Sequence, residues 1–205
     1  MNQNQNQIRL CTRRQWTAQH IVDRLSSEES LSIVPVHDQQ KGQEVDEYYS
    51  FVMNDGLTMI YVVVDRATSL PYIVLHGPLS AQSAWLLNML RVTEDIGTIQ
   101  QYCREAEHAE DKIDAICRLG IAAYFDEAQP EIVDTFKQYM RDGDARVRQS
   151  AIFATSFIGW PEFEPLLQIA MERDPDTRVS AIAESAIRIM RESDWGDTPS
   201  SQTRS

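Results

Sequence analysis

The chain has 205 residues, of which 42% are apolar and 24% charged, the usual balance of a globular protein. Its formal net charge is -12, which disfavours nucleic-acid binding, because such affinity comes mostly from neutralised phosphates, and favours a basic or neutral protein partner. No apolar run reaches the ~18 residues that a membrane span needs. Three scattered cysteines form no disulfide framework, so we expect a cytoplasmic protein with no membrane contact.

The first residues predict no secretory signal. Residues 1–8 are polar and lack a basic patch followed by an apolar stretch, so we expect a disordered polar leader. Residues 16–25 then predict a short amphipathic helix, because Trp16, Ile21 and Leu25 fall on one side of it.

A β-meander is predicted next. The pair Asp55-Gly56 lies between two runs rich in β-branched and aromatic residues, 47–53 and 57–64, which is a strong hairpin pattern. A turn at 65–69 leads to a third strand over 70–76, and 31–36 is a candidate fourth strand. Helix and meander together predict a small α+β module over residues 9–79 that packs its apolar face against a neighbour.

The rest of the chain is predicted to be helical. Residues 80–97 and 98–109 favour helices that would form a degenerate first repeat or a capping pair. From residue 110 on, one helical pattern occurs three times, at separations of 34 and 32 residues. The matched positions follow one helix face, and they are Glu110/Asp144/Asp176, Ile113/Val147/Val179, Cys117/Ala151/Ala183, Gly120/Ala154/Ala186 and Tyr124/Ile158/Met190.

Each column of this pattern has a physical reason. The acidic residue is expected to open each helix, where it accepts from unpaired backbone N–H groups. The Cys, Ala or Gly columns allow neighbouring helices to approach closely. A second kind of helix also repeats, over 129–140 and 160–171, with Pro130 and Pro161 in the first turn. The unit is therefore a helix, a short turn and a helix.

These features resemble the HEAT-like repeats that include the phycobilisome-lyase type. The resemblance is carried by the acidic residue before each second helix, by Val147-Arg148 with Ala151 after it, and by Gly159 closing that helix. It covers residues 110–192, the C-terminal half. It implies a mostly α fold: an α-solenoid of antiparallel helix pairs over residues 80–192, behind the α+β module, and then an acidic Ser/Thr tail over 193–205. A plain helical bundle is the alternative fold.

Catalytic motifs were not found. The sequence has no Gly-rich phosphate loop, no Gly-x-Ser-x-Gly elbow, no His-Glu-x-x-His and no Cys-x-x-Cys. Cys103, His108 and Cys117 match no metal-ligand spacing. The acidic residues of 105–114 are either a docking patch or a solvated helix junction. We therefore expect a protein that is not an enzyme and has no catalytic residue, metal or cofactor.

Candidate partner-binding residues are Arg146, Arg148, Arg178 and Trp160. Each arginine lies in the first turn of its helix, where a cation opposes the helix dipole. We expect the arginines either to pair with Asp144 or Asp176 of a neighbouring repeat, as a ladder, or to bind the partner.

Two aromatic residues flank the last helices. Trp160 is expected to staple the helix that it opens. Trp195, in the tail, either folds back on the last repeat or anchors a peptide.

The predicted function is a protein-protein interaction, as a scaffold or adaptor. The resemblance also implies an alternative, a bilin lyase or chaperone-like helper for a cofactor-bearing protein. A second alternative is nucleic-acid binding through Arg146, Arg148 and Arg178. Repeats of this kind serve enzymes, adaptors and scaffolds alike.

Overall fold

The computed structural model describes residues 7–28, 33–40, 47–123 and 127–194. The chain forms two compact units: unit 1 is Met1–Glu105 with Ile121–Tyr124, and unit 2 is Ala106–Gly120 with Phe125–Ser205. In the described segments, no helix combines the length and apolar character that crossing a membrane requires. Residues 1–6 and 195–205, which include Trp195, lie outside the described residues, whereas the first two residues of the predicted tail, 193 and 194, end the last helix.

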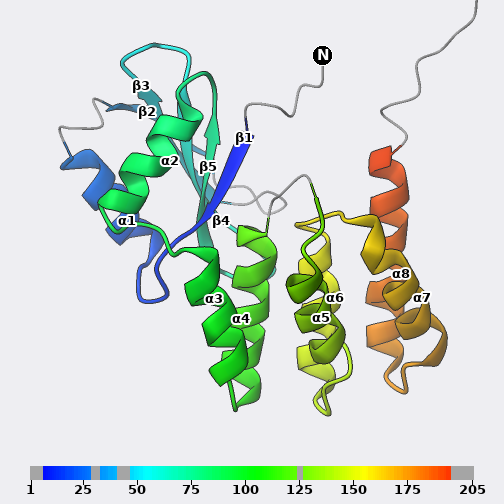
Figure 1. The fold of residues 1–205 in the computed structure, drawn as a ribbon. Helices are drawn as coiled ribbons and strands as arrows, with labels where there is room; N and C mark the ends of the chain where they lie inside the picture. Colours follow the sequence, from blue (N-terminus) through cyan, green and yellow to red (C-terminus); the bar gives the residue numbers. More distant parts are fainter. Residues whose placement is uncertain (1–6, 29–32, 41–46, 124–126, 195–205) are drawn as a thin grey trace, which may run out of the picture. The chain divides into compact units, whose positions relative to one another are not determined.

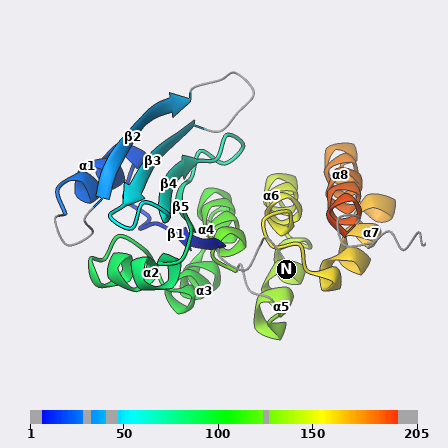
Figure 2. The same ribbon diagram turned by 90° about the horizontal axis from the view of Figure 1, so that it is seen from above.

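Unit 1 is built on a five-stranded antiparallel sheet (Figure 2). The strands lie in the order β1-β5-β4-β3-β2. Four of them form the predicted meander. Gly56, in the turn of the predicted Asp55-Gly56 hairpin, has a φ of 66°, which glycine tolerates without strain. The strands are β1 (Gln7–Cys11), β2 (Ile33–Gln40), β3 (Glu47–Met53), β4 (Met59–Val64) and β5 (Pro71–His76).

Strand β1 corrects the prediction of a disordered leader over residues 1–8 at residues 7 and 8. It begins at Gln7 and pairs antiparallel with β5, with Ile8 opposite Leu75 and Leu10 opposite Ile73. Its partner lies more than sixty residues away in the sequence, and no turn joins the two strands, so no hairpin pattern marks β1. Its hydrogen bonds depend on a tertiary contact.

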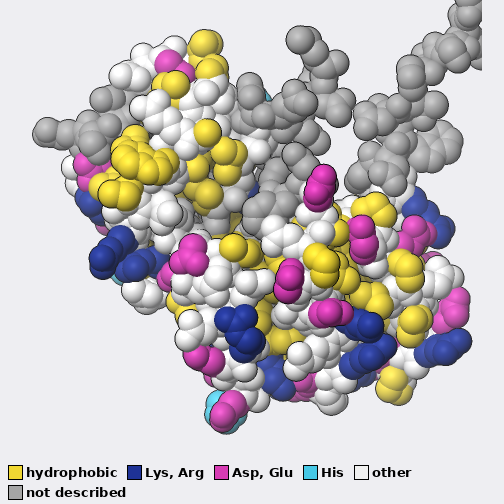
Figure 3. All heavy atoms as spheres, in the orientation of Figure 1, with side chains coloured by type: hydrophobic (Ala, Val, Ile, Leu, Met, Phe, Trp, Pro, Cys, Tyr) yellow, Lys and Arg dark blue, Asp and Glu magenta, His cyan; other side chains and the backbone are white. Residues whose placement is uncertain are grey.

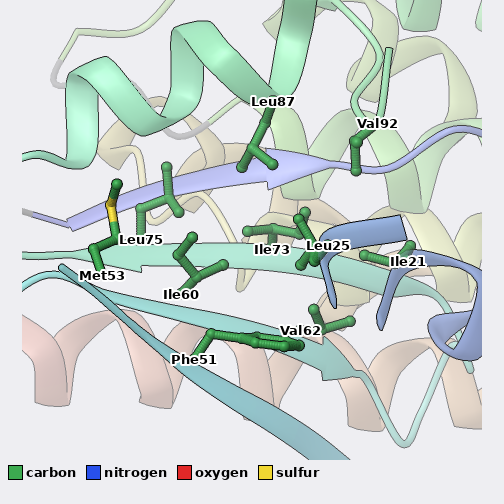
Figure 4. Close-up of a cluster of buried hydrophobic side chains, with 10 residues drawn as sticks. All are labelled: Ile21, Leu25, Phe51, Met53, Ile60, Val62, Ile73, Leu75, Leu87 and Val92. Carbon is green, nitrogen blue, oxygen red and sulfur yellow. The ribbon is translucent and has the colours of Figure 1, made fainter. Parts of the chain in front are cut away.

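Two helices cover one face of the sheet, α1 (Ala18–Ser26) and α2 (Ser80–Met89). Alternate residues of the strands face these helices in one apolar core (Figure 4). Helix α1 starts two residues later than predicted, because the Thr17 hydroxyl caps it by accepting from the His20 N–H at 3.3 Å. The buried residues of this core are Ile21, Leu25, Phe51, Met53, Ile60, Val62, Ile73, Leu75, Leu87 and Val92.

Helix α2 is shorter than the predicted helix 80–97 and has a different role. Arg91, after its end, has a φ of 55°, which stops the helix. Leu87 and Val92 lie in the core of unit 1, so α2 packs on the sheet and does not serve as half of a capping pair. The next helix, α3 (Ile96–Glu105), also belongs to unit 1. The unit boundary therefore falls after the one predicted at residue 79.

Paired helices make up unit 2 (Figure 1). Helix α5 packs on α6, α7 on α8, and α6 on α8. Pro161–Phe163 forms a 3-10 turn ahead of α7, so the predicted helix 160–171 begins in two stages. The helices are α4 (Ala109–Ala122), whose last residues belong to unit 1, α5 (Pro130–Tyr139), α6 (Ala145–Thr155), α7 (Glu164–Arg173) and α8 (Thr177–Asp194).

The small-residue columns lie where unit 2 is packed most tightly. Cys117, Ala151 and Ala183 are at most 2% exposed. A Cβ added at Gly120 would lie 2.7 Å from the carbonyl oxygen of Ala154, so only glycine allows α4 and α6 to come this close. The sequence prediction that small side chains permit close helix contact is confirmed at these positions.

Candidate functional site

The turns between paired helices share one hydrogen-bond design. In the turn after α5, the carboxylate of Asp142 accepts from the N–H of Asp144 at 2.9 Å, and Asp144 caps α6 by accepting from a backbone N–H at 2.8 Å. In the turn after α7, Asp174 and Asp176 repeat both contacts at 2.9 and 2.8 Å. The acidic cap prediction is confirmed in these two turns. Glu110 lies further in, inside the first turn of α4, where its carboxylate accepts from its own backbone N–H.

Buried ion pairs link one turn to the next helix pair. The Nε and Nη2 atoms of Arg148 each donate to the carboxylate of Asp174 at 2.8 Å, and Nη1 donates to the backbone oxygens of Asp142 and Gly143. Lys112 donates to Asp142 at 2.7 Å. The side-chain hydrogen bond from Arg148 holds the pKa of Asp174 below its ordinary value, and Lys112 does the same for Asp142. These contacts fix the turns in place.

The predicted arginine ladder is therefore present in part. Arg148 does cross to the neighbouring repeat, but its acceptor is Asp174 and not Asp176. Arg146 bridges Asp144 at 2.7 Å and Glu110 of α4 at 2.9 Å. The side chain of Arg178 is 79% exposed and contacts the Asp176 carboxylate of its own turn at 3.3 Å. The three arginines do not converge on one site.

Trp160 is a packing residue. It is 4% exposed, and its ring stacks on that of Phe163, with centroids 5.8 Å apart. Phe163 in turn contacts Phe136, with centroids 5.0 Å apart. The burial and stacking of Trp160 fit the expected staple role.

A groove opens between the C-terminal ends of α5 and α7, in unit 2. Its volume is about 320 Å³. Apolar side chains form its floor, and among them Ile169 is 51% exposed. The groove is lined by Lys137, Met140, Arg141, Asp142, Arg148, Leu166, Ile169, Ala170, Arg173, Asp174 and Pro175.

Unpaired positive charge surrounds this floor. Within the described ranges, Lys137, Arg141 and Arg173 have no carboxylate partner, whereas the two lining carboxylates are already paired, with Lys112 and with Arg148. Figure 3 shows Lys and Arg side chains beside apolar ones over this part of α5 and α7. The groove is therefore locally positive, in a chain whose net charge is -12.

Sequence reasoning did not select these three cations. Arg141 and Arg173 occupy equivalent places in the two turns, each directly before the first aspartate, so the repeat alignment already paired them. Lys137 is one turn earlier, near the end of α5. The missing information was which cations have carboxylate partners. The predicted candidates Arg146 and Arg148 are neutralised, and these three are not.

A second exposed apolar surface lies on α2, in unit 1. Trp85 and Met89, one helical turn apart, are 61% and 65% exposed. No charged residue occurs between Ser80 and Leu90. Two large apolar side chains exposed side by side on an uncharged helix make this face a second candidate contact surface.

The described residues were searched for metal-ligand clusters, reactive thiols and shifted carboxyl pKa values. No group of three or more His, Cys, Asp or Glu side chains among them is arranged to hold a metal ion. The three cysteines are buried and unbridged. The shifted carboxyl pKa values belong to helix caps, turns and ion pairs, which are structural causes of such shifts.

Known proteins give no further evidence on the function of this chain. Comparisons with protein-family models, with curated proteins and with solved structures found no match. The likeness to HEAT-like repeats therefore stands on the residues of the chain itself.

Proposed function

We propose that this chain is a non-enzymatic protein-binding module, a scaffold or adaptor, and that its helical region is a HEAT-like α-solenoid that holds a protein partner. Two features support a solenoid over a plain bundle. The turns Asp142–Asp144 and Asp174–Asp176 have the same hydrogen-bond design. Arg148 ties one helix pair to the next, as expected where each repeat contacts its neighbours in sequence.

The groove between α5 and α7 carries the proposal. It combines an exposed apolar floor with a charged rim, which is the composition of a protein-binding site. Ile169 would supply the apolar contact, since burying a half-exposed isoleucine contributes on the order of 1 kcal/mol. The ion pairs of Arg148 and Lys112 hold the two turns beside the groove in one arrangement, so the backbone of these turns loses little ordering entropy on binding.

The nucleic-acid alternative through Arg146, Arg148 and Arg178 is weakened by their partners. Arg148 is 9% exposed and engaged by Asp174. Arg146 faces two carboxylates. A phosphate would have to displace these acids at Arg146 and Arg148, and Arg178, with a side chain 79% exposed, contacts the Asp176 carboxylate of its own turn at 3.3 Å.

The bilin-helper alternative remains a prediction with no observation that favours it. None of the residues that line the groove is a histidine, and a volume of about 320 Å³ is at the small end for ligand sites.

A matched pair of substitutions tests the proposed function. Ile169 and Ile189 are exposed to similar extents, 51% and 47%, but only Ile169 lines the groove. We expect Ile169→Glu to abolish capture of the wild-type partner from the source cell, and Ile189→Glu to leave it unchanged. The partner is then purified and its affinity for each variant measured.

A third variant separates the two candidate surfaces. Trp85→Ser alters the apolar face of α2 in unit 1. Loss of the partner with Trp85→Ser, together with full capture by Ile169→Glu, would assign binding to α2 and refute the groove.

A further inference from the structure

We infer that the groove between α5 and α7 receives a short acidic segment of the partner, in which carboxylates flank one or two apolar side chains. This inference rests on the proposed function and names the chemistry of the partner. It follows from the unpaired positive charge around the groove and from the apolar side chains of its floor.

The positive charges on the rim of the groove are not neutralised by carboxylates in the described part of the chain. Lys137, Arg141 and Arg173 make no ion pair in the described part of the chain. Acidic residues outnumber basic ones by 31 to 19, so an unpaired cation cluster is unexpected. Arg141 and Arg173 recur at equivalent positions beside paired aspartates, on either side of the same groove. Such a rim complements a partner that brings its own carboxylates.

The floor requires an apolar group between those carboxylates. Leu166 is half-buried and Ile169 half-exposed, and Met140 and Ala170 lie beneath them at 9% exposure each. A purely charged ligand would leave this apolar surface in water. A side chain such as leucine or phenylalanine would cover it, and a volume of about 320 Å³ has room for one or two of them.

A nucleic acid fits this groove poorly. Proteins that hold single strands use aromatic side chains on which bases stack, and none of the lining residues is aromatic. A long polyanion would also meet the net charge of -12 beyond the three cations. A short acidic segment places its charges on the rim alone.

The experiment uses the full-length chain and two fluorescent peptides. One has a Leu-Ile-Leu centre flanked by Asp and Glu, and the other replaces these acids with Asn and Gln. Fluorescence polarisation measures the Kd of each, with a single-stranded DNA oligonucleotide as a third probe. We expect the acidic peptide to bind at least about tenfold more tightly than the neutral peptide or the DNA, and its affinity to fall as salt is raised.

Charge reversal locates the binding. The double variant Arg141→Glu/Arg173→Glu changes two exposed residues that make no internal ion pair, so we expect a stable fold and a loss of acidic-peptide affinity of about tenfold or more. The control is Arg188→Glu, which changes an exposed arginine of α8 outside the groove. It should leave the Kd within about twofold.

The possible failures are distinct. If neutral and acidic peptides bind equally, if the DNA binds as tightly, or if Arg188→Glu weakens binding as much as the double variant, the acidic-segment inference is overturned. The proposed function still stands in those cases if Ile169→Glu abolishes partner capture. If Ile169→Glu captures the partner normally, the proposed function fails as well.

Discussion

The contact between α4 and α6 at Gly120 gives the sharpest test of the packing. In an ordinary helix, replacing glycine by alanine stabilises by about 0.5–1 kcal/mol. Here the new Cβ would lie 2.7 Å from the Ala154 carbonyl oxygen and 3.0 Å from the Ala154 Cβ. The oxygen is part of the backbone and cannot rotate away, so we take about 2–3 kcal/mol, the upper part of the usual overpacking range. The net effect of Gly120→Ala is then a destabilisation of about 1–2 kcal/mol.

Thermal unfolding followed by helical circular dichroism measures this effect. A cost of 1 kcal/mol lowers the Tm by about 4–8 °C for a unit of roughly 100 residues. The control is Gly143→Ala, because a Cβ at Gly143 meets nothing within 4 Å, and this variant should keep the wild-type Tm or raise it slightly. A rise in Tm for Gly120→Ala would refute the close approach of α4 and α6.

Three further outcomes follow from the packing and the ion pairs of unit 2. Ala151→Leu should overpack the interior by about 1–3 kcal/mol, because Ala151 is fully buried, whereas Gln149→Leu on the same helix should change the Tm little; the opposite order would refute the helix face assigned to α6. Arg148→Met should lower the free energy of unfolding in urea by about 2–4 kcal/mol, because it leaves the Asp174 carboxylate buried and unpaired. Arg146→Met breaks an exposed contact and should leave the urea midpoint nearly unchanged. The folded-state pKa of Asp174 is lowered, so the stability that its ionised carboxylate contributes is full above the unfolded pKa of about 3.9 and is lost as pH falls through the folded pKa. The Asp174→Asn variant should therefore be less stable than the wild type at neutral pH and lose less stability between about pH 5 and 2. Equal losses in the variant and the wild type would contradict this assignment.

Local patterns in the sequence were enough to locate most of the elements. The pair Asp55-Gly56 between β-branched runs predicted the β3–β4 hairpin, because turn chemistry acts over a few residues. The acidic caps Asp144 and Asp176, with apolar and small residues at helical spacing, predicted α6 and α8. These features depend on neighbours in the chain, so the chain alone reveals them.

The elements that were missed depend on distant contacts. Strand β1 is held by β5, which is far along the sequence. Helix α2 was predicted as part of a longer helix, but its uncharged polar and apolar residues are spread around it without one apolar face, so its pattern could not show that Leu87 would face a sheet core and Trp85 would be exposed. The end of α2 depends on the positive φ of Arg91, a conformation that arginine rarely adopts and that its sequence does not indicate.

The repeated helix–turn–helix pattern and the local caps could be predicted from the sequence, because helix propensity and capping act within a few residues of the chain. Which cations are neutralised depends on the tertiary structure. Arg148 and Arg173 look alike in the sequence, but folding brings Asp174 onto Arg148 and leaves Arg173 unpaired beside Ile169. Ion pairing depends on distances of a few ångströms between side chains far apart in the chain. The positive groove therefore exists only in the folded protein.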